Sequence, residues 1–454
     1  MSRLNKRLKD NFSANAYAQI VNIIYQLAIV PFFLFFWTQD VYGEWLILSA
    51  LPSYLALSNV GIMTVAHNKM TMFMLNNDAI NAKKSLDTVW VAQMGIGMVA
   101  MLTVLCFLWW MDVTKVFNLT SIKRDTASIT IIILFIYALV NQQIGIFGGV
   151  YRAIGKNAKG IFVINTVRLM SVVGIIVTLW LIDRSTISIA LALLVTTIIG
   201  GIYIFYDTKK SNKTLTPGFS GFNIECLKED IKLGIGFTAF PLGRALTNQG
   251  MLIVCNHFLG SGAVVILSVV RTVVNMVFQV SNMVSLSTWP EFSRLYVKGD
   301  AYRLKRLFIF STSISTWLSV IFSTVIYILG SDLIKLWTAG KIGVEDGVLL
   351  LFLITMILNS CWHTASTTFN AINNHQKVAK CYFLCSILSL IFAYNIEVIF
   401  EFGLYSIAIS LLIVEILMIF YVVPKALIFL DIKKQHWIRE MLILPLKYVL
   451  KDKV

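Results

Sequence analysis

Three arginines stand deep inside long apolar stretches of the sequence. Arg168, Arg244 and Arg271 each lie roughly ten residues from the nearer end of such a stretch. On a helix that distance is about 15 Å, too far for the side chain to reach water easily. A guanidinium group donates two parallel hydrogen bonds that suit phosphate oxygens. The arginines therefore predict a cavity that binds an anion, and pairing with a helix carbonyl or an acid is the alternative.

Uncharged amide side chains occur in the same kind of stretch. They come in short groups, at 141–142, at 248–249 and at 359. At membrane depth such groups either bond between helices or face water, where sugar hydroxyls would match them. We expect the substrate-binding residues to be Arg168, Arg244, Arg271, Asn141, Gln142, Asn248, Gln249 and Asn359.

Glu415 is the acid that lies deep in an apolar stretch. It either pairs with an arginine or takes up a coupling proton, because burial makes a carboxyl group easier to protonate. No zinc-protease HExxH motif, phosphate-binding glycine loop or cysteine pair with metal spacing occurs. We expect no catalysis, no cofactor and no metal site.

The composition indicates the elements that must position these residues. The chain is 57% hydrophobic and 13% charged, whereas a soluble domain is about half apolar and a quarter charged. Apolar runs of roughly 20 residues read as membrane-spanning helices. We predict an all-α membrane protein with about twelve such helices, placed near 15–37, 42–66, 88–110, 127–150, 159–182, 187–206, 233–256, 262–289, 307–329, 347–369, 379–399 and 403–424.

The basic residues predict the orientation of the chain. With the N-terminus inside, 29 of the 38 lysines and arginines fall in cytoplasmic segments and six in outer connections. Positive charge collects on the cytoplasmic side of membrane proteins, so both termini should be cytoplasmic. Because the charges lie in short stretches between apolar runs, the net charge of +15 does not indicate binding to nucleic acid.

The sequence divides into two similar halves. We expect a six-helix lobe over 1–206, a cytoplasmic linker over 207–232, a second lobe over 233–424 and an amphipathic cytoplasmic tail over 425–454 on the inner leaflet. Asp78-Ala79 with Lys83-Lys84 recurs as Asp300-Ala301 with Lys305-Arg306, and two other matches have nearly the same offset. Two pseudo-symmetric lobes that rock about a central cavity are a transporter architecture.

Three segments carry a family resemblance. They are YGEWLILS at 42–49 with PSYLALSNVGI at 52–62, Asp78-Ala79 with Lys83-Lys84, and YRAIGK at 151–156. These segments resemble the polysaccharide transporter family, the O-antigen flippases of the multidrug/oligosaccharidyl-lipid/polysaccharide (MOP) exporter superfamily. The resemblance implies a MATE-like fold in a bacterial cytoplasmic (inner) membrane. It also implies a role in lipopolysaccharide and polysaccharide biosynthesis.

The resemblance implies a substrate and partners. The substrate would be a polyprenyl-pyrophosphate-linked oligosaccharide, flipped from the inner to the outer leaflet of the lipid bilayer. The polysaccharide polymerase machinery is a further expected partner. A drug or metabolite antiporter of the same fold is the alternative, although the multidrug branch often carries acids in its N-terminal lobe and this chain has no deep acid there. A membrane enzyme is less consistent with the short outer connections.

Overall fold

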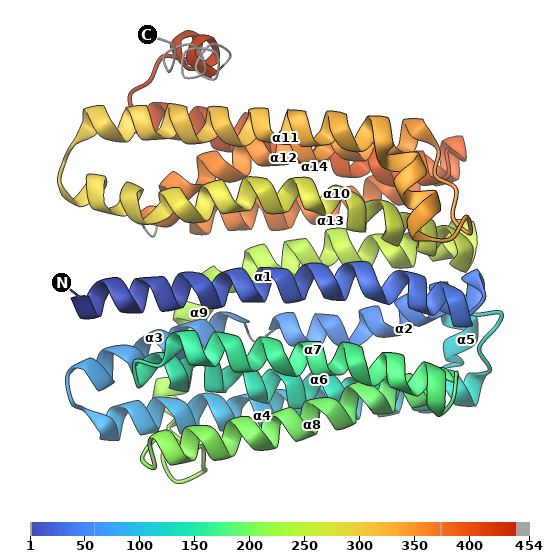
Figure 1. Ribbon diagram of the computed structural model, residues 1–454, viewed down its shortest axis with the longest axis horizontal. Helices are drawn as coiled ribbons and strands as arrows, with labels where there is room; N and C mark the ends of the chain where they lie inside the picture. The colour runs from blue at the N-terminus through green and yellow to red at the C-terminus, as the bar shows by residue number, and fades with distance from the viewer. Residues whose placement is uncertain (1, 59, 373–374, 442–454) are drawn as a thin grey trace. The chain divides into compact units, whose positions relative to one another are not determined.

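The computed structural model describes residues 2–58, 60–372 and 375–441, and these are helical with short connections (Figure 1). No strand occurs among the described residues. The elements in chain order are α1 (Ser2–Phe36), α2 (Gln39–Ser58), α3 (Val60–Leu75), α4 (Ala79–Trp110), α5 (Val113–Val116), α6 (Arg124–Ala153), α7 (Asn157–Leu181), α8 (Thr186–Ser211), α9 (Ile224–Ala245), the π-helical turn η1 (Leu246–Gly250), α10 (Met251–Val297), α11 (Ala301–Trp337), α12 (Asp346–Ala371), α13 (Gln376–Phe400) and α14 (Leu404–Phe429).

The number of membrane crossings agrees with the prediction of about twelve. Ten stretches of the described residues are long and apolar enough to span a bilayer. One of them, Thr238–Tyr296, has 59 residues, which is about 90 Å of helix against a hydrocarbon core of about 30 Å. Gly260, with φ +79°, breaks this stretch into two spans. The helices α2 and α3, on either side of residue 59, together make one further crossing.

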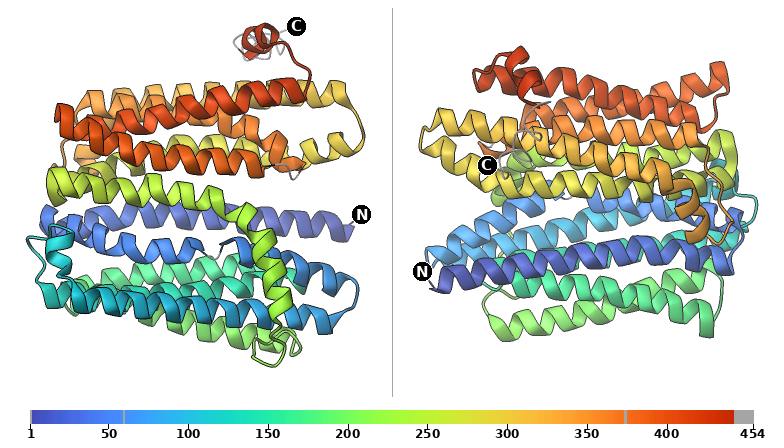
Figure 2. Two further views of the ribbon diagram at one scale, coloured as in Figure 1. Left: turned by 180° about the vertical axis from the view of Figure 1, so that it is seen from behind. Right: turned by 45° about the horizontal axis from the view of Figure 1, so that its top comes forward.

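The helices form two compact units, Met1–Ala245 and Leu246–Val454. This division comes later in the chain than the predicted linker, because α9 packs against α3 and belongs with the first unit. The left view of Figure 2 shows α9, in yellow-green, running obliquely away from the linker. The linker is also shorter than predicted, since α8 continues to Ser211 and α9 already begins at Ile224.

The first unit is built around α6, which packs against α2, α3, α4, α7 and α8. A buried apolar cluster joins most of these helices and includes Met70, Leu86, Phe147, Val167 and Ile204. Because α6 is covered on so many sides, few of its side chains remain accessible. This makes any accessible polar residue on it informative.

The second unit is built around α12, which packs against α10, α11 and α14. Buried hydroxyl groups bond between three of these helices: Thr364 donates to Ser315 at 2.8 Å, and Ser315 donates to Ser281 at 3.1 Å. Small side chains let membrane helices approach closely, and hydroxyl groups add bonds between them. These hydroxyl bonds therefore connect the three helices where they pack closely.

Two equivalent capping residues support the internal repeat. Asp78 caps α4 by accepting the backbone N–H of Asn81 at 3.1 Å. Asp300 caps α11 in the same way through the N–H of Arg303, also at 3.1 Å. An N-cap aspartate satisfies a backbone donor that has no partner inside the helix. The recurring Asp-Ala pair therefore marks the start of corresponding helices in the two halves.

The start of the predicted tail is still part of α14, which continues through Pro424 to Phe429. Residues 434–441 then form a short helix that docks on α11. Trp437 Nε1 donates to Thr312 Oγ1 at 3.2 Å, and the carbonyl of Met441 accepts from Ser313 and Trp317 at 2.8 and 3.0 Å. Figure 1 shows this helix nearly end on, so its axis crosses that of α11. The rest of the predicted tail, 442–454, lies outside the described residues.

Candidate functional site

Arg168 lies on a different face of α7 from most of the exposed apolar side chains of that helix. Several exposed apolar side chains of α7 recur every three or four residues, as in a lipid-facing stripe; they are Met170, Val173, Val177 and Trp180. Arg168 lies on another face, together with the buried Ser171 and Ile175, one and two turns further on. The Arg168 side chain is nevertheless exposed. It is therefore exposed on the face that also carries these buried side chains.

The guanidinium group of Arg168 stacks on an aromatic ring. Its Cζ lies 4.6 Å from the centre of the Tyr25 ring on α1. Tyr137 on α6 lies within electrostatic range of both groups. A guanidinium held flat on a ring keeps its N–H edge available for further acceptors. Tyr25 and Tyr137 therefore belong to the candidate site, although our prediction from the sequence did not include them.

Asn141 is the exposed polar residue in the middle of α6. It stands one turn after Tyr137, and no other residue between positions 130 and 151 of this fully described helix is exposed. The neighbouring Gln142 is buried, with 7% of its surface exposed, and it is engaged in an interaction. In the first unit Arg168 of α7 thus lies beside Tyr25 of α1 and within electrostatic range of Tyr137 of α6, and Asn141 stands one turn beyond Tyr137. We call these four residues the tyrosine–arginine site.

Arg271 has a different environment in the second unit. Its Nη1 donates to the backbone carbonyl of Asn248 at 2.6 Å, and its Nη2 donates to the Asn248 side-chain oxygen. Asn248 lies in η1, where the wider π-helical turn alters the regular hydrogen-bond pattern. Arg271 therefore satisfies a helix carbonyl, which was the alternative to anion binding. Gln249 occupies the next position of the same turn and is partly buried.

The remaining predicted arginine, Arg244, lies in the last turn of α9. Its side chain is partly buried and is engaged in an interaction. Arg168 and Arg244 belong to the first unit and Arg271 to the second. A cavity shared by all three arginines stays a prediction.

Glu415 is held by neutral donors in the second unit. The side chain is 6% exposed and accepts hydrogen bonds from Asn359 Nδ2, at 3.0 Å, and from Trp362 Nε1. Both donors lie on α12, three residues apart, so one helix face presents them together. The Asn359 side-chain oxygen is buried without a hydrogen-bond partner among the described residues. An amide oxygen that can accept a hydrogen bond therefore lies beside the carboxyl group of Glu415.

Metal-binding chemistry has no evident place in the described part of the chain. No group of three or more His, Cys, Asp or Glu side chains comes close enough there to hold a metal ion. The six cysteines are free thiols.

Comparison with known proteins identifies the fold. Solved structures match over nearly the whole chain. The chain has the MATE fold. The inward-facing structure of a multidrug resistance MATE family transporter of the MOP superfamily matches with a TM-score of 0.76 and 13% identity, covering 91% of this chain and 94% of that one. This agrees with the fold that the resemblance implied.

Two other structures give the same MATE architecture. The outward-facing form of a MATE family transporter matches with a TM-score of 0.69 and 13% identity, covering 94% of this chain and 96% of that one. A MOP superfamily transporter from Pyrococcus furiosus, described as having a binding pocket of reverse polarity, matches at 0.58 with 13% identity over 95% of both chains. No protein-family model and no curated protein matches the sequence.

Proposed function

We propose that this protein is an alternating-access transporter that flips a polyprenyl-pyrophosphate-linked oligosaccharide from the inner to the outer leaflet of a bacterial cytoplasmic membrane. The O-antigen type of repeat unit is the proposed cargo. The observation that carries the proposal is the placement of Arg168, an exposed residue within a helix long and apolar enough to span a membrane, on the face that also carries buried side chains. A charged group within a membrane span is costly and indicates function.

The chemistry of the tyrosine–arginine site suits this cargo. The guanidinium of Arg168, held on Tyr25, provides donors for pyrophosphate oxygens. The hydroxyl of Tyr137 and the amide of Asn141 both donate and accept, as sugar hydroxyls require. The four residues combine one positive charge with neutral polar groups. Such a combination favours a ligand with an anionic end and an uncharged polar end.

The alternative is a drug or metabolite antiporter of the same fold. It deserves a test because the first comparison structure is described as a multidrug resistance transporter. A cationic drug would need a carboxylate, and the tyrosine–arginine site contains none among its four residues. The charge of the site therefore favours the anionic cargo.

Glu415 is the proposed coupling residue. Its carboxyl group is buried and accepts hydrogen bonds from Asn359 and Trp362, and protonation would remove its charge and give it an O–H donor. We expect Glu415→Gln, which mimics the protonated acid, to bind cargo and to lose proton-driven turnover. Full transport by this variant would exclude Glu415 from coupling.

The decisive experiment removes the charge of Arg168. In a strain that lacks the chromosomal copy, Arg168→Ala should lose surface glycan, and the lipid-linked glycan should accumulate in the inner leaflet. Arg184→Ala is a matched control, because Arg184 also stacks on an aromatic ring, 5.0 Å from the centre of Phe36, but lies in an outer connection. Normal surface glycan with well-expressed Arg168→Ala would contradict the proposal. Loss of drug resistance with normal glycan would favour the antiporter.

A further inference from the structure

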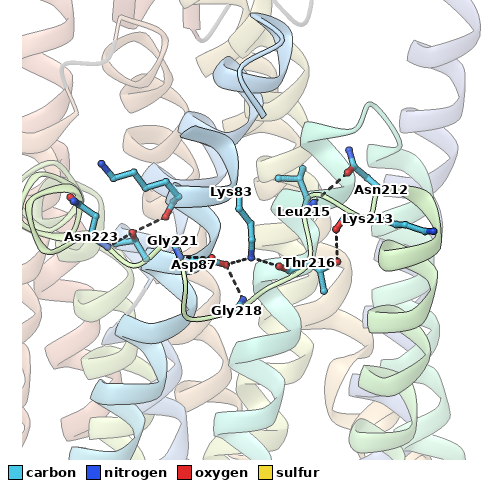
Figure 3. A network of polar contacts seen from close by, with 11 residues as sticks. Lys83, Asp87, Asn212, Lys213, Leu215, Thr216, Gly218, Gly221 and Asn223 are labelled. Carbon is cyan, nitrogen blue, oxygen red and sulfur yellow. Dashed lines mark hydrogen bonds and ion pairs between the residues drawn. The ribbon is translucent and has the colours of Figure 1, made fainter. Parts of the chain in front are cut away.

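The linker between α8 and α9, residues 212–223, is closely bound to the first unit. Leu215 is fully buried and belongs to the apolar cluster that includes Leu86 and Tyr151. A loop that inserts an apolar side chain into a core gains the free energy of burying it. Figure 3 shows the linker lying against α4 near Lys83 and Asp87.

Asp87 is the centre of the attachment. Its side chain is fully buried, and its two carboxylate oxygens accept backbone N–H groups from the linker, Oδ1 from Gly218 at 2.8 Å and Oδ2 from Gly221 at 2.9 Å. Lys83, one turn earlier, forms an ion pair with Oδ1 and also donates to the carbonyl of Thr216 (Figure 3). A buried carboxylate is stable only with several such partners.

The last residue of the linker is attached as well. The N–H of Asn223 donates to Thr88 Oγ1 at 3.2 Å, and the Asn223 side chain accepts the N–H of Cys226 at 2.8 Å. Asn223 therefore caps α9 and binds α4 at the same time. Along the linker, attachments to α4 or to the core occur at 215, 216, 218, 221 and 223.

The start of α9 continues the attachment. Asp230 is fully buried and pairs with Lys69 of α3 at 2.7 Å, and Glu229 pairs with the same lysine at 3.1 Å. Burial raises the pKa of Asp230, while its hydrogen bond to Lys69 opposes that rise. Further along, the backbones of Gly61 and Gly234 meet so closely that neither has room for a side chain. Linker and early α9 thus form one continuous band on α3 and α4.

We propose that Asp87 latches residues 212–223 onto α4 throughout the transport cycle, so that the linker moves as part of the first unit. The linker is therefore not a flexible tether between the units. Any change of backbone conformation that accompanies transport takes place outside this band. The latch itself does not depend on the proposed function. Only the transport measurement described below rests on that function.

The first test measures hydrogen exchange of the linker amides in the intact protein. The amides of Gly218 and Gly221 should exchange slowly, and Asp87→Asn should speed their exchange about 30-fold, because a charged acceptor is lost. Asp78→Asn on the same helix is the matched control, since asparagine also caps helices. Exchange of the wild-type amides at the rate of an unfolded peptide would overturn the latch.

The second test fixes the latch covalently. A Cβ atom placed on Gly221 would lie 3.3 Å from Asp87 Cβ, near the separation of about 3.8 Å in disulfides. Asp87→Cys with Gly221→Cys, in a background without the six native cysteines, should form a disulfide, and each single variant should not. The oxidised and reduced proteins should transport equally well. Transport that stops on oxidation and returns on reduction would overturn the proposal.

The two tests separate the latch from the proposed function. If the wild-type chain does not flip a lipid-linked glycan at all, the proposed function fails. The exchange measurement still decides the latch in that case, because it needs no substrate.

Discussion

At the scale of single residues, arginines of similar sequence context have different environments. Arg168 stacks on Tyr25 and remains accessible, whereas Arg271 is bound to the carbonyl and side chain of Asn248. A guanidinium that already satisfies two acceptors has fewer donors for a ligand. We therefore expect a structural role for Arg271, and the ligand role of Arg168 stays a proposal.

This difference predicts that Arg271 contributes more to stability than Arg168 does. Arg271→Ala should lower the free energy of unfolding by about 2 kcal/mol, because two hydrogen bonds from a charged donor are lost and η1 keeps an unsatisfied carbonyl. Arg168→Ala should change stability by less than about 1 kcal/mol, the usual size of an exposed cation–π contact. Thermal unfolding of both variants in detergent checks the contrast. Equal losses of stability would contradict the assigned roles.

At the scale of elements, the contact between α3 and α9 decides where the first unit ends. A Cβ atom on Gly61 would lie 2.2 Å from the carbonyl oxygen of Gly234, far inside van der Waals contact. Glycine on both helices therefore permits an approach that any other residue would prevent. This close approach makes α9 part of the first unit, although the hydrophilic linker precedes α9 in the sequence.

Gly61→Ala should separate α3 from α9 and destabilise the protein by about 1–3 kcal/mol, the usual cost of overpacking. Gly95→Ala in α4 is the matched control, because nothing lies within 4 Å of its added Cβ. That control should be neutral or stabilising by up to about 1 kcal/mol, since alanine favours helix. Melting temperatures of the two variants, measured side by side, test the expectation. A stable Gly61→Ala protein would mean that the helices can part without cost.

At the scale of the whole molecule, the charge bias predicts which side each connection faces. Lys434 stands in the helix after α14 and Lys123 before α6, and both are exposed. In a background without native cysteines, Lys123→Cys should react with a membrane-impermeant maleimide in intact cells. Lys434→Cys should react only after the membrane is opened. The reverse pattern would contradict cytoplasmic termini.

Much of the architecture could be predicted from sequence because the determining forces are local. A run of about 20 apolar residues must form a helix in lipid whatever surrounds it, since no other conformation satisfies its backbone there. The recurring Asp-Ala pair predicted an internal repeat, and in the structure each aspartate caps a helix, because a cap acts within one turn. The places of Arg168 and Asn141 within long apolar helices followed from their positions in the sequence.

The contacts between segments that are distant in the sequence were decided by the tertiary structure alone. Tyr25 and Tyr137 join Arg168 from two other helices, Asp87 binds a loop more than a hundred residues later, and Arg271 bonds to a turn of another helix. Sequence records the type and depth of such groups but not the rotation of each helix about its axis. That rotation depends on packing between side chains of many helices at once. It determines whether a buried charge meets a ligand, a loop or a carbonyl.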